Sequence, residues 1–140
     1  MRLLVTRPEP DGERTAQALR ARGHAVVLAP LLRTEPVAFV LPDRAFSAVV
    51  LTSANAARTV AAHRSLARVV ALPAFAVGRR TAEAARAVGF RDVHSADGDK
   101  ADLGALVRAQ LGAGRGPLLY LAGEDRAGRG IYPPAEHNCR

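Results

Sequence analysis

The sequence has few aromatic residues, one cysteine, one lysine and no tryptophan. Because aromatic residues make up only 4% of the 140 residues, the core must consist mainly of aliphatic side chains. The single cysteine, Cys139, excludes an internal disulfide and fits a reducing compartment. No segment reaches the roughly 20 apolar residues that a membrane helix needs, and Met1–Thr6 is too short for the apolar region of a secretory signal. We therefore expect a cytoplasmic protein that does not bind membranes.

The basic charge is spread along the chain. The formal net charge is +7, and 20 residues are basic, of which Lys100 is the only lysine. The arginines form no continuous basic run, and the chain has no aromatic platform on which bases could stack. This pattern argues against nucleic acid as a partner and leaves a polyanionic small molecule as the compatible one. With 49% hydrophobic residues, the composition is that of a globular protein.

Short β-like runs alternate with helical patterns, which predicts an α/β fold of parallel-sheet, flavodoxin-like βα units. The expected strands are 3–6, 24–29, 48–51, 75–77, a short one at 93, and 117–121. The expected helices are 11–22, 54–63, 79–88 and one that starts at Asp99 and includes Leu111. Asp11 is expected to cap the first helix, and Gly23 and Gly89 to end the first and third. Residues 33–45, with two prolines and no helical period, are expected to connect two domains.

Three strand-to-helix turns are candidates for ligand binding, because parallel sheets bind ligands at the carboxyl ends of their strands. They are Thr6-Arg7-Pro8, Thr52-Ser53-Ala54-Asn55 and Gly78-Arg79-Arg80-Thr81. Helix N-termini at such turns also present free N–H groups to anions. Each turn has a structural explanation as well: Pro8 enforces a turn, Ser53 caps a helix and Gly78 serves backbone geometry.

No metal site is expected. The four histidines, His24, His63, His94 and His137, show no metal-ligand spacing with one another or with Cys139. The stretch Asp97-Gly98-Asp99 lacks the later ligands and the closing Glu of a calcium loop, and Asp99 with Asp102 is better explained as a helix start.

Five segments in order resemble bacterial uroporphyrinogen-III synthases: VTRPEPDGERTAQALRARGHAVVLAPLL, VVLTSANAARTV, FAVGRRTAEAARAVGF, HSADGDKADLGALV and LLYLAGEDRAG. The resemblance runs from Met1 to about Gly128 and rests on the order of the segments. It implies cyclisation of hydroxymethylbilane to uroporphyrinogen III, with inversion of ring D and loss of water, in haem and porphyrin biosynthesis. It also implies a lyase of the hydro-lyase type that needs no cofactor, acts as a monomer and holds a tetrapyrrole with eight carboxylates between two α/β domains.

The resemblance also implies a set of substrate-binding residues and a domain plan. The residues are Thr6, Arg7, Pro8, Thr52, Ser53, Asn55, Gly78 and Thr81. Gly123, Glu124 and Arg126 match the last similar turn, whereas Arg79 and Arg80 stand where relatives vary; no catalytic residue is assigned. The plan makes 1–32 a βαβ piece of a discontinuous first domain, 46–128 a second domain that lacks its last units, and 129–140 an off-pattern tail.

Because relatives continue further, we expect this chain to be a truncated synthase. Tyr132, in an Ile-Tyr-Pro-Pro context, does not match the family's Tyr motif and is given no role. Two alternatives stay open: an inactive fragment or anion-binding α/β module without catalysis, and a basic nucleic-acid binder of similar fold. Formation of the type III isomer would separate the enzyme from the first, and salt-sensitive DNA binding would favour the second.

Overall fold

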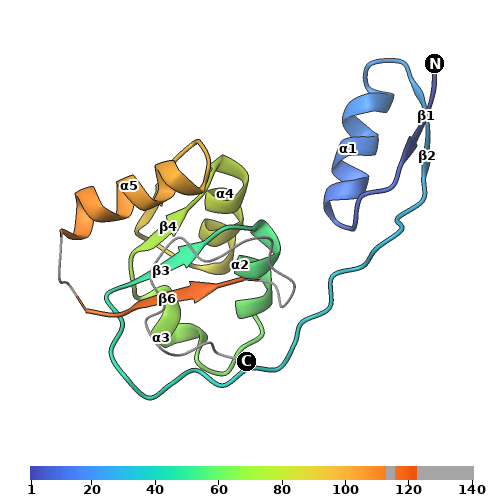
Figure 1. Cartoon of the computed structure of the whole chain (residues 1–140). Coiled ribbons are helices and arrows are strands. Elements are labelled where there is room, and N and C mark those ends of the chain that lie inside the picture. Colours follow the sequence, from blue (N-terminus) through green and yellow to red (C-terminus); the bar gives the residue numbers. More distant parts are fainter. Residues whose placement is uncertain (113–115, 123–140) are drawn as a thin grey trace. The chain divides into compact units, whose positions relative to one another are not determined.

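A computed structural model of the chain describes residues 1–112 and 116–122 (Figure 1). The chain divides into two compact units, Met1–Val37 and Ala38–Arg140, which we call the N-terminal unit and the C-terminal unit. Residues 29–47, which contain the expected connecting segment, hold no helix or strand.

The N-terminal unit is a βαβ unit. It comprises β1 (Arg2–Val5), α1 (Asp11–Arg20) and β2 (Ala25–Leu28). The two strands are parallel, with Arg2 opposite Ala25 and Val5 opposite Leu28. Helix α1 packs on one face of this two-stranded sheet, where Val5 and Ala16 are buried. Leu4 and Val27, which alternate with the residues of that face, are 64% and 45% exposed.

The C-terminal unit is built on a four-stranded parallel sheet. Its strands are β3 (Ala48–Leu51), β4 (Ala74–Ala76), β5 (Val93–Ser95) and β6 (Leu118–Leu121). Their order in the sheet is β5-β4-β3-β6, so the chain moves outward from β3 in one direction and then returns to place β6 on the other side of it. This is the doubly wound order, in which the connections reverse direction beside the first strand.

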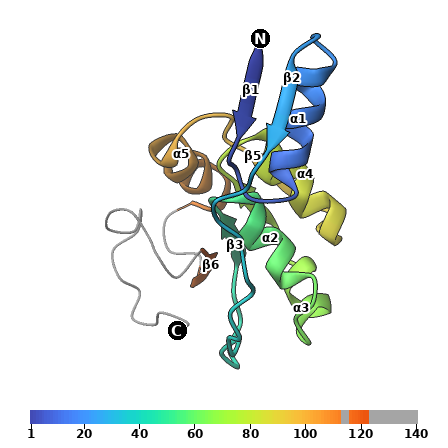
Figure 2. The same ribbon diagram turned by 90° about the vertical axis from the view of Figure 1, so that its right-hand side faces the viewer.

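Helices cover both faces of the C-terminal sheet (Figure 2). They are α2 (Ala54–Val60), α3 (Leu66–Val70), α4 (Arg79–Val88) and α5 (Lys100–Leu111). Val49 and Leu51 face α2, α3 and α4 in one buried cluster, whereas Val50 and Phe75 face α5 in another. The core is mainly aliphatic, as the low aromatic content predicts, with Phe75 its largest fully buried side chain.

The predicted fold class is confirmed, since strands and helices alternate along the described residues and the strands form parallel sheets. Strand 48–51 and helix 79–88 have the predicted bounds, and Gly89 ends α4 in the left-handed conformation at φ 119°. The predicted helix start at Asp99 also forms, and it is a capping box: the Asp99 carboxylate accepts from the Asp102 N–H, and the Asp102 carboxylate accepts from the Asp99 N–H.

Two helix predictions are wrong in detail. Asp11 does not cap α1; it is the first helical residue and the N-cap is Pro10, while the Glu9 carboxylate accepts from the Glu13 N–H at 3.2 Å. The predicted helix 54–63 ends at Val60, and α3 follows it unpredicted. The His63 ring explains the break, because its Nδ1 accepts a hydrogen bond from the Ser65 N–H at 3.1 Å and the ring stacks on Phe39.

Three predictions lie outside the described residues: the turn with Gly123, Glu124 and Arg126, the tail 129–140, and the context of Tyr132.

Candidate functional site

Two of the three candidate turns lie side by side at the carboxyl edge of the C-terminal sheet. Thr52 follows β3 and Gly78 lies two residues after β4, and these strands are parallel neighbours with Leu51 opposite Ala76. The Val77 N–H donates to the Leu51 carbonyl at 3.1 Å and extends this pairing to the turns themselves. The structure therefore brings together the residues that sequence comparison placed in these two turns.

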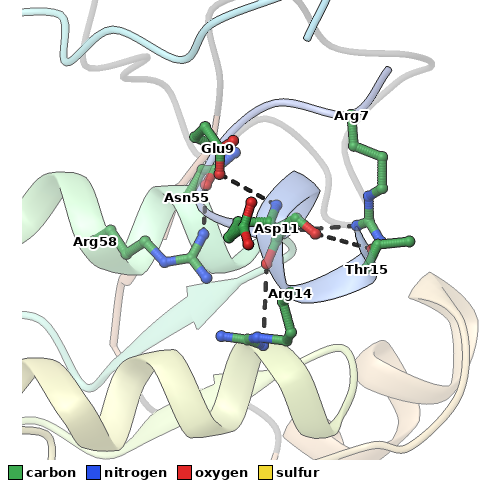
Figure 3. A network of polar contacts seen from close by, with 8 residues as sticks. Arg7, Glu9, Asp11, Arg14, Thr15, Asn55 and Arg58 are labelled. Carbon is green, nitrogen blue, oxygen red and sulfur yellow. Dashed lines mark hydrogen bonds and ion pairs between the residues drawn. The ribbon is translucent and has the colours of Figure 1, made fainter. Parts of the chain in front are cut away.

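The first of these turns is held by hydrogen bonds of its own. Ser53 is the N-cap of α2, and its hydroxyl accepts from the Ala56 N–H at 3.1 Å. The Asn55 side-chain oxygen accepts from Nη1 of Arg58 at 2.7 Å (Figure 3). Ser53 thus has the structural role of a cap, and Asn55 in the first turn of α2 pairs with Arg58 in its last turn.

Gly78 is not required by the fold. Its φ of −160° is extended backbone that any residue adopts, and a Cβ at this position would meet nothing within 4 Å. It is the N-cap of α4, and no side chain caps this helix. The first-turn N–H groups of an uncapped helix have no partner within the helix, and the missing side chain at Gly78 leaves their approach open.

Thr81 is the one buried polar residue among the described parts of the chain. It is 5% exposed and lies in the first turn of α4. Within residues 1–112 and 116–122 its hydroxyl makes no hydrogen bond, unlike that of Thr59, which donates to the Asn55 carbonyl at 2.9 Å. A buried hydroxyl without a partner costs stability, so its presence next to an uncapped helix end needs a reason beyond packing.

The third turn, Thr6-Arg7-Pro8, belongs to the N-terminal unit and joins β1 to α1. The exposed Arg7 side chain donates from Nη1 to the Thr15 hydroxyl at 3.2 Å, and its Nη2 lies 3.8 Å from the Asp11 carboxylate (Figure 3). Asp11 also lies 4.0 Å from Nη1 of Arg14. These contacts hold the Arg7 guanidinium over the first turn of α1.

Sequence reasoning missed Tyr120. Its hydroxyl lies 3.1 Å from the Thr52 hydroxyl, although 68 residues separate the two in the chain. No local motif marks Tyr120, because its position depends on β6 pairing with β3. The register that would identify it, Val50 opposite Tyr120, follows only from the sheet.

The described residues include neither a cluster of metal ligands nor a helix of membrane-spanning character. They contain no group of three or more His, Cys, Asp or Glu side chains that could hold a metal ion. Among them, no helix has the length and apolar character needed to cross a bilayer.

A family model described as uroporphyrinogen-III synthase HemD matches residues 13–129. The chain belongs to the uroporphyrinogen-III synthase family. A search of curated proteins found no match. The family match supports a role in tetrapyrrole biosynthesis, and it implies a small tetrapyrrole as substrate.

The matched range includes the two turns of the C-terminal unit and begins after Thr6, Arg7 and Pro8. The assignment of these three residues to the site therefore rests on the sequence resemblance alone.

Proposed function

We propose that the chain closes hydroxymethylbilane to uroporphyrinogen III, with inversion of ring D and loss of water. In this proposal, carboxylate arms of the substrate bind to the turns that contain Thr52, Ser53, Asn55, Gly78 and Thr81. Arg7, in the turn after β1, contributes a guanidinium that pairs with another carboxylate. Holding the arms fixes which ends of the linear tetrapyrrole meet, so positioning supplies much of the catalysis.

The observation that carries the proposal is the uncapped start of α4. A carboxylate there would accept hydrogen bonds from N–H groups of the first turn, which have no partner within the helix, and would be favoured by the helix dipole. It would also give the buried Thr81 hydroxyl an acceptor, which it lacks among the described residues. Gly78 adds no side chain that would obstruct the anion, and the fold itself does not demand a glycine there.

The substitution Thr81→Val tests the proposal, because it preserves shape and removes the unpartnered hydroxyl. The purified full chain is given hydroxymethylbilane, and the type III isomer is counted against the type I isomer of spontaneous closure. We expect wild type to form type III, and Thr81→Val to lower kcat/KM for it by roughly 10-fold to 100-fold, as for a lost hydrogen bond to a charged group. Its stability should stay equal or rise, because no folded-state hydrogen bond is lost.

Thr59→Val is the matched control. It makes the same change on α2, but it removes a hydroxyl that is bonded to the Asn55 carbonyl. We expect this variant to lose some stability and to keep wild-type activity. Type III formation no greater than background in the wild-type reaction would refute the proposed activity. If the chain then still bound a polycarboxylate porphyrin, it would be an anion-binding α/β module without catalysis.

A further inference from the structure

The hydroxyls of Thr52 and Tyr120 form a pair at a special place in the C-terminal sheet. Strands β3 and β6 are neighbours (Figure 1). Thr52 follows Leu51, the last residue of β3, which is opposite Leu121. Because side chains alternate along a strand, Thr52 lies on the same face as Val50, and Tyr120 is opposite Val50. The Tyr120 side chain thus reaches along this face to the carboxyl end of β3, where the two oxygens are 3.1 Å apart.

This position is the switch point of the sheet. The order β5-β4-β3-β6 means that the connection after β3 leads to one side and the strand β6 comes from the other. In doubly wound sheets, ligands bind beyond the carboxyl ends of the strands where the connections diverge in this way. The hydroxyl pair is therefore located where the topology itself favours a ligand.

The hydrogen-bonding capacity of the pair points to an acceptor. Two hydroxyls carry two protons, and their mutual hydrogen bond uses one of them. Among the described residues, neither hydroxyl has a further hydrogen-bond partner. Either oxygen could donate, but a phenol is the stronger donor and an alcohol the better acceptor, which favours donation from Tyr120 and leaves the Thr52 proton for another acceptor. A hydroxyl that accepts one hydrogen bond becomes a better donor of the next.

We propose that Tyr120 is a positioning residue for substrate binding: it orients the Thr52 hydroxyl so that this group donates to a carboxylate oxygen of the tetrapyrrole. This inference rests on the proposed function, because it takes the ligand class from it. Tyr120 acts through Thr52 and need not touch the substrate.

A double-mutant cycle on the full chain tests this coupling. Tyr120→Phe keeps the ring in its packing and removes only the hydroxyl, and Thr52→Val removes the group that Tyr120 orients. We expect Tyr120→Phe to raise KM for type III formation roughly fivefold, the value of one hydrogen bond, with kcat little changed. In the Thr52→Val background the same change should have no effect on KM. Thr52→Ser, which retains the hydroxyl, should restore most of the affinity.

Ser95→Ala provides the control. It also removes a bonded hydroxyl at the end of a strand of the same sheet, since Ser95 donates to Asp97 at 2.6 Å, but β5 is not adjacent to β3. Its KM should equal that of wild type. A full fivefold effect of Tyr120→Phe in the Thr52→Val background, or no effect in the wild-type background, would overturn the inference.

A binding measurement distinguishes failure of this inference from failure of the proposed function. Uroporphyrin III, the oxidised product, carries the same carboxylates and does not react, so its affinity can be measured by fluorescence. If the chain forms no type III isomer but binds uroporphyrin with the expected coupling, the coupling stands and the catalysis is wrong. If type III forms without the coupling, only the inference fails. Absence of uroporphyrin binding by wild type would contradict the inference too.

Discussion

Strands β2 and β3 have the same sequence, Ala-Val-Val-Leu, at residues 25–28 and 48–51. In β3 all four side chains are buried, whereas in β2 none is buried and Val27 is 45% exposed. The strands have the same intrinsic preference for extended backbone, so propensity cannot explain the difference. Burial in this protein is decided by what packs on each face.

The cause is the number of covering layers in each unit. The C-terminal sheet lies between α5 on one face and α2, α3 and α4 on the other, with β3 in its interior. The N-terminal sheet has two strands and, within its own unit, only α1 to cover it. Parallel strands normally read as continuous apolar runs because both faces are covered. β2 has such a continuous apolar sequence, but within the N-terminal unit only one face of its sheet is covered by a helix.

The largest predicted contrast comes from replacing the third residue of this shared sequence. Val50→Thr places a hydroxyl in a site that is 0% exposed and should lower the free energy of unfolding by about 2–3 kcal/mol. Val27→Thr makes the same isosteric change on the open face and should alter it by less than about 0.5 kcal/mol. Chemical denaturation of both variants checks the contrast. Equal costs would show that the Val27 face is covered in solution.

A second substitution should weaken the N-terminal unit alone. A Cβ at Gly12 would lie 2.6 Å from the Arg7 carbonyl oxygen and 3.2 Å from Cδ1 of Leu28. Because the closer atom is backbone, it cannot move aside as a flexible side chain does. We expect Gly12→Ala to destabilise this unit by about 1–2 kcal/mol and to disturb the turn that holds Arg7.

Amide hydrogen exchange gives the unit-by-unit readout for Gly12→Ala. Exchange should accelerate at Ala25 and Ala29, whose N–H groups donate to the Met1 and Val5 carbonyls across the sheet, and stay unchanged at Val49 and Leu51. Gln17→Ala, an exposed change on the same helix, is the matched control and should leave both strands as in wild type. Acceleration in β3 as well would mean that the two units unfold together.

Features set by local sequence could be predicted, whereas features set by distant contacts could not. The bounds of β3 and α4 are local, because the apolar run 48–51 ends at Thr52 and Gly89 allows the left-handed residue that ends α4. The end of α2 is not local, since it depends on His63 contacting Phe39, 24 residues away. The candidate turns were found from motifs, but Tyr120 needed the strand register. Only the structure reveals that the backbone conformation at Gly78 does not require a glycine.

The smallest expected effect concerns helix capping, which differs between α1 of the N-terminal unit and α5 of the C-terminal unit. Pro10, the N-cap of α1, offers no side-chain acceptor, and the Glu9 carboxylate accepts from the Glu13 N–H at 3.2 Å, whereas α5 begins with a reciprocal capping box at Asp99. Hydrogen bonds from the backbone N–H groups of Asp102 and Ala101 hold the pKa of the Asp99 carboxyl below its ordinary 3.8. A carboxyl whose pKa is lower in the folded state stabilises that state above its unfolded pKa, and this contribution disappears as the pH falls through the folded value.

Asp99→Ala should therefore lower stability at neutral pH, and its difference from wild type should shrink as the pH is reduced below 3.8. Asp99→Asn keeps a side-chain acceptor for the N–H groups and should lose less. Urea denaturation at pH values on both sides of 3.8 measures both differences. Ser53→Ala removes the uncharged cap of α2 and should give a loss that does not change over this range. A pH-independent loss for Asp99→Ala would show that its charge adds nothing to the cap, so that α5 starts through hydrogen bonding alone.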